Sequence, residues 1–124
     1  MTDPVKVVVS ALGTSLDDRV DERFGRAEFL LVVDTETLAV EALDNTANRD
    51  AMQGSGLGAA ESAAGHGAAA VVTGHLGPKA FQALHIAGIE GFNGTGMTVR
   101  EAVAAWKGRR LEQLTEGEAH TGIA

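Results

Sequence analysis

The sequence predicts an α/β fold with a mixed five-stranded sheet and helices on both faces. Apolar segments rich in β-branched residues come first, as in an antiparallel meander. Helical patterns then alternate with strand patterns, as in right-handed crossover units. At 124 residues the chain is about the size of one ordinary domain. We therefore expect the element order β-β-β-α-β-α-β-α around a single core.

Three strands are predicted in the first half of the chain. Residues 5–10 and 28–34 are nearly continuous apolar runs, which are typical of buried strands. Residues 38–43 alternate apolar side chains with Glu41, as a half-solvated hairpin partner does. The polar residues 45–53 are expected to form a loop that leads to the first helix.

The second half of the chain alternates predicted helices with predicted strands. In order, we expect a helix ending near Gly65, a strand at 68–73, a helix between Gly77 and Gly88, a strand at 89–92 and a helix from Thr98 to Gly108. Pro78 suits the first turn of a helix. Thr98 and Glu101 have the spacing of a capping box, which favours a helix start at this point.

The composition excludes several classes of function. A formal net charge of −7 disfavours a nucleic-acid surface, because phosphate binding needs a summed basic field. The absence of cysteine excludes disulfides and thiolate ligands. The first apolar run is shorter than that of a signal peptide, and no stretch reaches membrane-spanning length. We expect a cytoplasmic protein without membrane partners, with one domain over residues 1–112 and a polar, flexible tail over 113–124.

The loops at one edge of the predicted sheet form the candidate site. Ligands on such sheets usually lie beyond the carboxyl ends of the parallel strands, where residues 10–16, 54–58, 73–79 and 93–98 should meet. These segments are rich in glycine and in helix starts, so many backbone N–H groups can point into one cleft. Each glycine-rich loop alone also fits a plain tight turn. Their convergence favours an anion-binding site.

A few basic side chains can lie at this edge of the sheet, although the net charge of the chain is negative. Arg19, Arg23 and Arg26 flank the Phe-Gly step at 24–25, and Lys79 lies in the first turn of a predicted helix; each also fits a solvated surface charge. His75 follows a strand end, where a neutral imidazole can ligate a soft metal or donate a hydrogen bond. The other three histidines are interpreted as structural or solvated.

Familiar catalytic motifs are missing or out of context. Residues 54–59 (GSGLGA) are similar to a dinucleotide fingerprint, but a polar loop precedes them in place of the required strand. The chain contains no P-loop string, and no Ser, His and Asp constellation has supporting context. We therefore expect a binding protein and not an enzyme.

Five strings together resemble the dinitrogenase iron–molybdenum cofactor biosynthesis family. They are VKVVVSALG near the start, DERFGRA from Asp21, LVVDTET from Leu31, VTGHLGPKAF from Val72 and NGTGMTVREAV from Asn93. The resemblance covers roughly residues 5–112, and the strings occur in the family's order and spacing. It implies a ribonuclease-H-like fold, a three-layer sandwich. Nucleases of that fold hold two metal ions with carboxylates, one of which lies on the first strand, where this chain offers only Val, Lys and Ser10. Phosphodiester cleavage is therefore not expected.

The resemblance also implies the ligand. The size, the missing cysteine and the alanine–glycine bias are most similar to family members of sulfate-reducing bacteria that carry a mixed molybdenum–copper sulfide cluster. Many members have a cysteine where this chain has Leu76. A cluster that brings its own sulfides needs only N–H donors, nearby cations and apolar walls from the protein. Leu12, Phe24, Leu76 and Met97 are candidate walls, although each also fits plain core.

We therefore predict noncovalent binding, carriage or assembly of an anionic molybdenum–copper sulfide cluster, with an iron–molybdenum sulfide cluster as the alternative. The predicted contacts are Ser10, Leu12, Gly13, Arg19, Phe24, Gly25, Arg26, Gly54, Gly56, Gly74, His75, Leu76, Gly77, Lys79, Asn93, Gly94, Thr95 and Met97, with His75 also a candidate metal ligand. A protein complex that receives or uses the cluster is an expected partner of the monomer or weak dimer. The alternatives are a phosphate-ligand or nucleotide binder, including a weak hydrolase, and a ligand-free interaction module of a division or redox complex.

Overall fold

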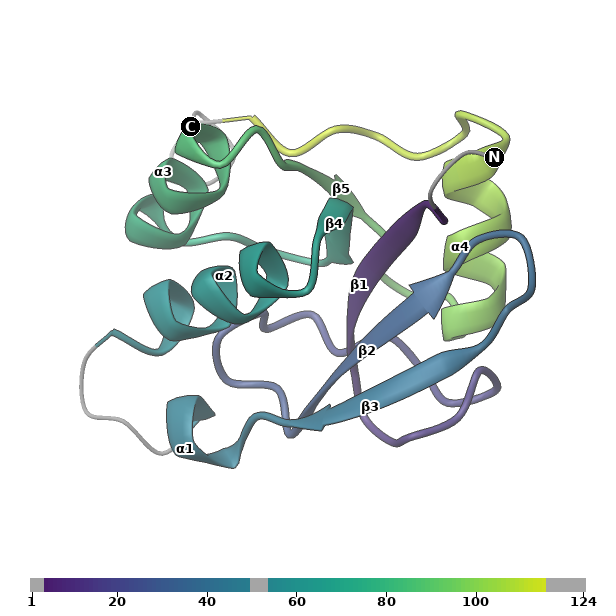
Figure 1. Cartoon of the computed structure of the whole chain (residues 1–124), viewed down its shortest axis with the longest axis horizontal. Coiled ribbons are helices and arrows are strands. Elements are labelled where there is room, and N and C mark those ends of the chain that lie inside the picture. The colour runs from purple at the N-terminus through teal and green to yellow at the C-terminus, as the bar shows by residue number, and fades with distance from the viewer. Residues whose placement is uncertain (1–3, 50–53, 116–124) are drawn as a thin grey trace.

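The computed structural model describes residues 4–49 and 54–115. Its elements are β1 (Lys6–Ala11), β2 (Phe29–Asp34), β3 (Val40–Asp44), α1 (Thr46–Arg49), α2 (Ser55–Gly65), β4 (Ala68–Thr73), α3 (Pro78–Ile86), β5 (Glu90–Asn93) and α4 (Val99–Lys107). The strands form one sheet in the order β3-β2-β1-β4-β5 (Figure 1). Strand β1 pairs antiparallel with β2 and parallel with β4, while β4 and β5 are parallel. The predicted mixed five-stranded sheet is confirmed.

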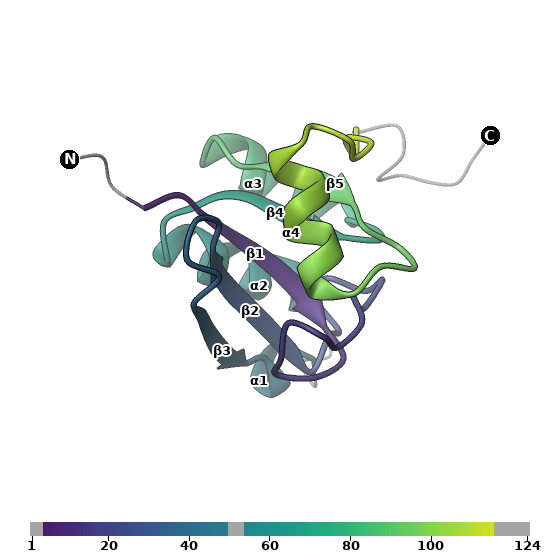
Figure 2. The ribbon, with the colours of Figure 1, turned by 90° about the vertical axis from the view of Figure 1, so that its right-hand side faces the viewer.

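Both faces of the sheet are covered by helices, because the central strands are apolar on both sides. Val8 faces α2 and α3, whereas Val7 and Val9 face α4, as the two-residue period of a strand requires. Figures 1 and 2 show α2 and α3 on one side of the sheet and α4 on the other. All three valines are fully buried, and each contributes roughly 1.5–3 kcal/mol to folding.

Local signals set the ends of the helices. The Thr98 hydroxyl accepts a hydrogen bond from the Glu101 amide at 3.1 Å, and the Glu101 carboxylate accepts one from the Thr98 amide at 2.9 Å. This reciprocal pair is the predicted capping box at the start of α4. Gly88, beyond the end of α3, has a φ of 76°, which a residue with a side chain rarely adopts. Within residues 4–49 and 54–115, no helix has the length and apolar content needed to cross a membrane.

A short helix, α1, occupies part of the segment that was expected to be only a loop. The Asp44 carboxylate accepts hydrogen bonds from the Thr46 hydroxyl at 2.6 Å and from the Thr46 amide at 2.9 Å. Both bonds hold the pKa of Asp44 below its usual value, and the bond from the Thr46 hydroxyl has the larger effect. The carboxylate thereby starts a helical turn that apolar periodicity cannot reveal. Residues 50–53 of the predicted loop lie outside the described residues.

Residues 112–114 lie against β5, at the boundary where the flexible tail was predicted to begin. The Glu112 carbonyl accepts a hydrogen bond from the Asn93 amide at 2.9 Å, and the Leu114 amide donates to the Gly91 carbonyl at 2.8 Å. Leu114 is buried in the core beside α3. Residues 112–114 therefore cover the edge of β5, which otherwise exposes unpaired backbone groups. Residues 116–124 of the predicted tail, with His120, lie outside the described residues.

Candidate functional site

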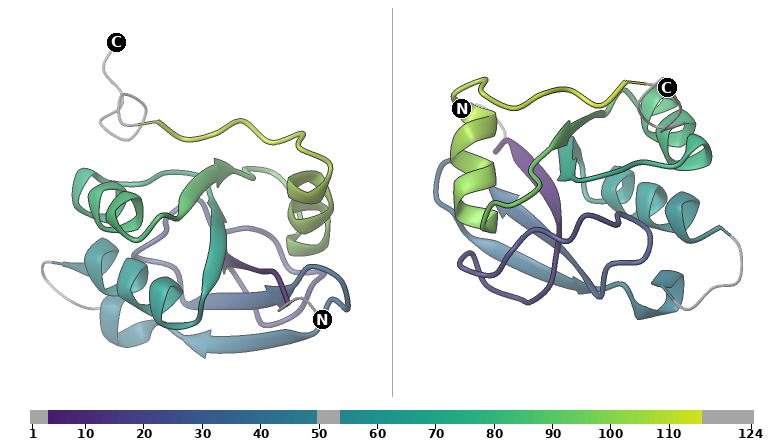
Figure 3. Two further views of the ribbon diagram at one scale, coloured as in Figure 1. Left: turned by 45° about the horizontal axis from the view of Figure 1, so that its top comes forward. Right: turned by 180° about the vertical axis from the view of Figure 1, so that it is seen from behind.

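The connection between β1 and β2, residues 12–28 (the β1–β2 loop), runs along the edge of the sheet where β1, β4 and β5 end. Figure 3 shows it passing from the α4 side of the molecule to the α2 side. On the α4 side, the carbonyls of Leu16 and Asp18 accept hydrogen bonds from the first two amides of α4, each at 2.8 Å. The Val20 amide donates to the Met97 carbonyl at 2.9 Å. The loop is thus part of the fold and lies at the predicted ligand edge.

Two buried hydroxyls fasten this loop to the central strands. The Ser10 hydroxyl donates to the Asp21 carbonyl at 2.6 Å and lies 2.8 Å from the Thr73 hydroxyl. The Asp21 amide donates to the Ser10 carbonyl at 2.8 Å. Ser10 and Thr73 are both fully buried. Ser10 was predicted to contact the ligand, but its hydroxyl is enclosed and already bonded, so it positions the loop instead.

The same loop presents Arg23 as an oriented cation. The Asp21 carboxylate, only 4% exposed, accepts hydrogen bonds from the Arg23 amide at 2.9 Å and from Nε and Nη2 of its guanidinium, both at 3.2 Å. These side-chain bonds and the adjacent negative charge raise the pKa of Arg23 above its ordinary value. The Arg23 side chain is 63% exposed, so the guanidinium is accessible to solvent while its bonds to Asp21 fix its orientation. Arg23 was predicted as a candidate cation at this edge but was not among the predicted contacts, although the sequence contains the Asp-x-Arg spacing.

Arg23 lies beside His75, which follows the end of β4. The two residues form an isolated parallel bridge. Gly74 permits this approach, because a methyl group on it would lie 2.7 Å from the Glu22 Cα atom and 2.9 Å from the Thr95 hydroxyl. His75 is exposed. The predicted meeting of the loops after β1, β4 and β5 is therefore present in the fold.

The N-termini of α2 and α3 meet at the same edge. A methyl group on Gly25 would lie 2.5 Å from the Gly56 nitrogen, and one on Gly56 would lie 3.0 Å from the Ala80 Cβ atom. Among residues 4–49 and 54–115, no side chain caps α2 at Gly54 or α3 at Gly77. The first amides of a helix lack intrahelical acceptors and carry its positive dipole end, so two such ends side by side favour an anion.

Two further side chains lie at these helix starts. Lys79 is exposed in the first turn of α3 and has no ion-pair partner among the described residues. Leu57, in the first turn of α2, is 40% exposed and was not among the predicted contacts. Together they offer a charge and an apolar surface beside the uncapped amides.

The segment 93–98 supplies fewer free donors than expected. The Gly94 amide donates to the Thr73 carbonyl at 2.8 Å, the Thr95 amide to the Asn93 side chain at 2.9 Å, and the Met97 amide to the Gly94 carbonyl at 3.1 Å. Gly94 is buried, and Met97 packs against the core on the α4 face. The first amides of α4 also have hydrogen-bond acceptors already, in the capping box and in the carbonyls of the β1–β2 loop. This part of the predicted site mainly stabilises the fold.

Several other predicted contacts differ in accessibility. Phe24 and Leu76 are 2% and 1% exposed and belong to the core around α2 and α3, so burial removes them from the predicted walls. Leu12 is 56% exposed. It lines an open hollow of about 340 Å³ together with Val20, Asp21, Glu22 and Arg23.

The remaining predicted residues divide between the two ends of the loop. Gly13 faces the Asp18 carboxylate closely, which disfavours an anion there. The Arg19 guanidinium donates to the Gly96 carbonyl at 3.1 Å on the α4 side. The Arg26 guanidinium donates to the Arg49 carbonyl at 2.6 Å at the end of α1. The part of the edge best suited to an anion is therefore formed by residues 22–26, 54–57 and 74–79, which we call the open-helix edge.

The groups at this edge could hold an anion without forming a covalent bond to it. Among residues 4–49 and 54–115, no group of three or more His, Asp and Glu side chains is arranged to hold a metal ion. His66 is occupied as a structural residue, with Nδ1 2.8 Å from the Ser62 carbonyl, and His85 stacks on Phe81. His75 remains the accessible imidazole at the edge. Backbone amides, Arg23 and Lys79 can hold an anion, and His75 can add one ligand.

Comparisons with known proteins extend over nearly the whole chain. A family model described as dinitrogenase iron–molybdenum cofactor matches residues 5–109, which include every strand and helix from β1 to α4. The apo form of the orange protein from Desulfovibrio gigas is 41% identical, with 91% of this chain and 95% of that chain covered and a TM-score of 0.84. A structure from Thermotoga determined by NMR is 35% identical, with coverage of 90% and 94% and a TM-score of 0.77. An uncharacterized protein of Methanocaldococcus jannaschii is 28% identical over 118 residues, or 92% of this chain and 99% of that protein.

The buried carboxylate of Asp21 is expected to contribute more to the free energy of unfolding than an exposed carboxylate does. Asp21→Asn should lower the free energy of unfolding by about 1–3 kcal/mol, because it weakens charge-assisted bonds at a buried group. Urea denaturation measures the change. Asp17→Asn is the control, since Asp17 pairs with Arg100 at 3.1 Å while 77% exposed and should leave the midpoint nearly unchanged. Equal effects of the two substitutions would contradict the anchoring role of Asp21.

Close packing of the loop on α2 is expected to make Gly25 intolerant of a side chain. Gly25→Ala should destabilise the protein by about 1–3 kcal/mol or more, because the methyl group would overlap the Gly56 backbone. Gly65→Ala is the matched control, since a methyl group there meets open space at the end of the same helix. Thermal melts should show a lower Tm for the first variant and no loss for the second. A tolerated Gly25→Ala would show that the loop and α2 are farther apart than described.

Proposed function

Because the chain belongs to the dinitrogenase iron–molybdenum cofactor family, we propose that it binds and carries an anionic metal–sulfide cluster at the open-helix edge. In this proposal the cluster is a molybdenum–copper sulfide and is held noncovalently as cargo. An iron–molybdenum sulfide is the alternative composition. The choice of molybdenum and copper rests on the resemblance seen in the sequence, while the choice of place rests on the geometry of the edge.

The proposal rests on one observation, which is that the start of α4 is capped whereas, among the described residues, the starts of α2 and α3 are not. The N-terminus of α4 is closed by its own capping box and by carbonyls of the β1–β2 loop. The N-termini of α2 and α3 have no side-chain cap from the part of the chain that the structure describes, and they touch each other through Gly56 and Ala80. Fixed amide dipoles hold an anion without reorganisation, which is how proteins bind phosphate-like groups. A charged cluster is favoured here even though the chain carries a net charge of −7.

The residues present fit a cluster that brings its own sulfides. The chain has no cysteine to replace those sulfides. Leu76, which stands where many family members have cysteine, is buried and offers no ligand atom. Arg23 and Lys79 would pair with the negative charge, Leu12 and Leu57 would cover apolar surface, and His75 would ligate one soft metal.

We propose a carrier or assembly role and no catalytic one. Strand β1 (KVVVSA) contains no carboxylate, so it does not supply the metal ligands that ribonuclease-H-like nucleases need on their first strand. The ribonuclease-H-like assignment of the fold is part of this proposal, and the antiparallel meander followed by two crossovers supports it. The cytoplasmic location, the monomeric or weakly dimeric state and a protein complex that receives the cluster stay predictions.

Reconstitution tests the proposal. The protein is mixed anaerobically with tetrathiomolybdate and a copper(I) salt, desalted, and examined by visible absorption and metal analysis. A coloured, near-stoichiometric species should stay with the wild type, and high salt should weaken but not abolish its retention. Arg23→Gln combined with Lys79→Gln should weaken retention about tenfold, or ~1.4 kcal/mol, because two cations at the edge are lost.

The control must change the net charge by the same amount elsewhere. Lys107→Gln combined with Arg110→Gln does so at the far end of α4, and it should retain the cluster like the wild type. Circular dichroism confirms that each variant is folded before metals are added. A cluster that is not retained by the wild type contradicts the proposal. Equal losses in both double variants would mean that net charge, and not the open-helix edge, governs retention.

A further inference from the structure

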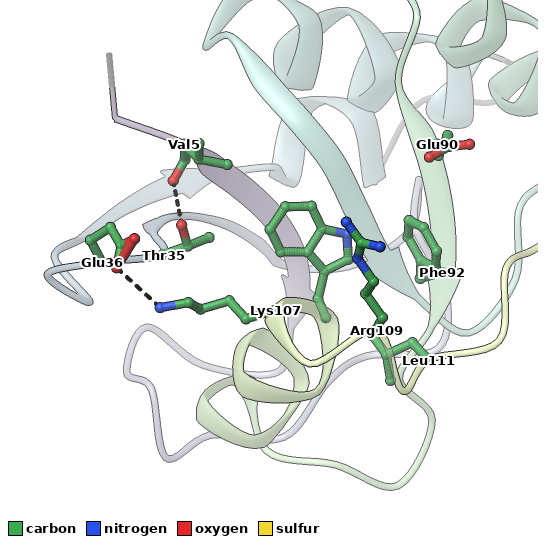
Figure 4. A pocket seen from close by; sticks show the side chains of 9 residues that line it. Val5, Thr35, Glu36, Glu90, Phe92, Lys107, Arg109 and Leu111 are labelled. Atoms are coloured by element: carbon green, nitrogen blue, oxygen red, sulfur yellow. Dashed lines mark hydrogen bonds and ion pairs between the residues drawn. The ribbon is translucent and has the colours of Figure 1, made fainter. Parts of the chain in front are cut away.

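A larger pocket lies at the opposite end of the sheet from the open-helix edge. It has a volume of about 640 Å³ and is lined by Val5, Thr35, Glu36, Glu90, Phe92, Trp106, Lys107, Arg109 and Leu111. These residues come from the starts of β1 and β5, the end of β2 and the end of α4, and Figure 4 shows this pocket from close by. Its volume is within the range of about 300–1,000 Å³ that is usual for small-molecule sites.

Four of the nine residues that line this pocket are apolar, and two of these four are aromatic. Phe92 and Trp106 are half-buried and pack against the core on the α4 face, as does Leu111. Val5 is 43% exposed. Two aromatic rings that are covered on one side and accessible on the other suit a flat, apolar molecule.

Of the four charged side chains that line the pocket, two form an ion pair with each other, and the other two, Glu90 and Arg109, have no partner of opposite charge among the described residues. The Lys107 ammonium lies 3.1 Å from the Glu36 carboxylate, and the Glu90 carboxylate accepts a hydrogen bond from the Gln113 amide group at 3.1 Å. The Arg109 guanidinium has no hydrogen-bond or ion-pair partner within the part of the chain that the structure describes. Figure 4 shows its side chain extending from beyond the end of α4 into the pocket. The pocket therefore offers one forked cation to an incoming anion.

The backbone of Arg109 has an unusual left-handed conformation, which is independent of the charge of its side chain. Its amide donates to the Trp106 carbonyl at 3.0 Å, and the Arg110 amide donates to the Ala105 carbonyl at 2.9 Å. This pair of bonds is the Schellman pattern, in which Arg109 takes the position usually held by glycine. Its φ is 57°, in the left-handed region that disfavours a side chain. Such strain, kept at a residue whose charge points into a pocket, is typical of binding sites.

We propose that this pocket binds a small organic acid with a flat apolar body and a single carboxylate, such as an arylacetate. The carboxylate pairs with the Arg109 guanidinium through two parallel N–H···O bonds, and the ring lies against Trp106 and Phe92. This ligand site is separate from the open-helix edge, because the two lie beyond opposite ends of β1. Its occupancy does not depend on the cluster.

Trp106 makes the test direct because it is the only tryptophan in the chain. Its indole N–H gives a single, isolated resonance in a proton–nitrogen NMR spectrum of the full chain without metal. Phenylacetate should shift this resonance saturably. Phenylacetamide, which has the same shape without the charge, should bind at least about tenfold more weakly, as expected when one charge-assisted pair is lost.

Substitution at Arg109 separates binding from folding. Arg109→Gly should lose the preference for phenylacetate over phenylacetamide while its Tm stays equal or rises, because glycine favours the left-handed backbone. Arg110→Gln is the matched control: its guanidinium donates to the Ala104 carbonyl at 3.4 Å and does not line the pocket, so binding should be unchanged. Absence of a saturable shift, equal binding of the acid and the amide, or unchanged preference in Arg109→Gly would each overturn the proposal.

Discussion

The buried hydroxyls of Ser10 and Thr73 hold the β1–β2 loop against β1 and β4 through the carbonyl of Asp21. A loop of this length has many conformations, and hydrogen bonds made out of contact with water reduce them to one. The position of Arg23 follows from this anchor, because the Asp21 carboxylate that orients it belongs to the anchored residue. The contact of Gly25 with the start of α2 lies further along the same loop.

The five-stranded sheet could be predicted from the sequence because the patterns that indicate strands and helix starts are local. Continuous apolar runs predicted the strands, and the Thr98 capping box predicted the start of α4. It was insufficient for the roles of individual glycines and polar residues. Whether Gly25 frees an amide or packs on a helix depends on Gly56, a residue far along the chain, and the burial of Ser10 depends on Thr73 in another strand. Such contacts leave no periodic pattern to read.

Two ends of one sheet offer different kinds of binding surface. At the open-helix edge, the first amides of α2 and α3 and the cations Arg23 and Lys79 are the groups that would attract an anion to a chain of net charge −7. At the other end, aromatic walls and the strained Arg109 form a pocket for a smaller, flatter anion. Between them, the buried valines of the central strands form the core that joins the two ends.

Locating the metal in cluster-loaded protein crystals by anomalous scattering at the molybdenum edge tests the central claim most directly. Binding at the open-helix edge predicts one strong peak there, next to the first turns of α2 and α3 and within reach of Arg23 and His75. A peak in the pocket of Trp106, or at the capped start of α4, would contradict it.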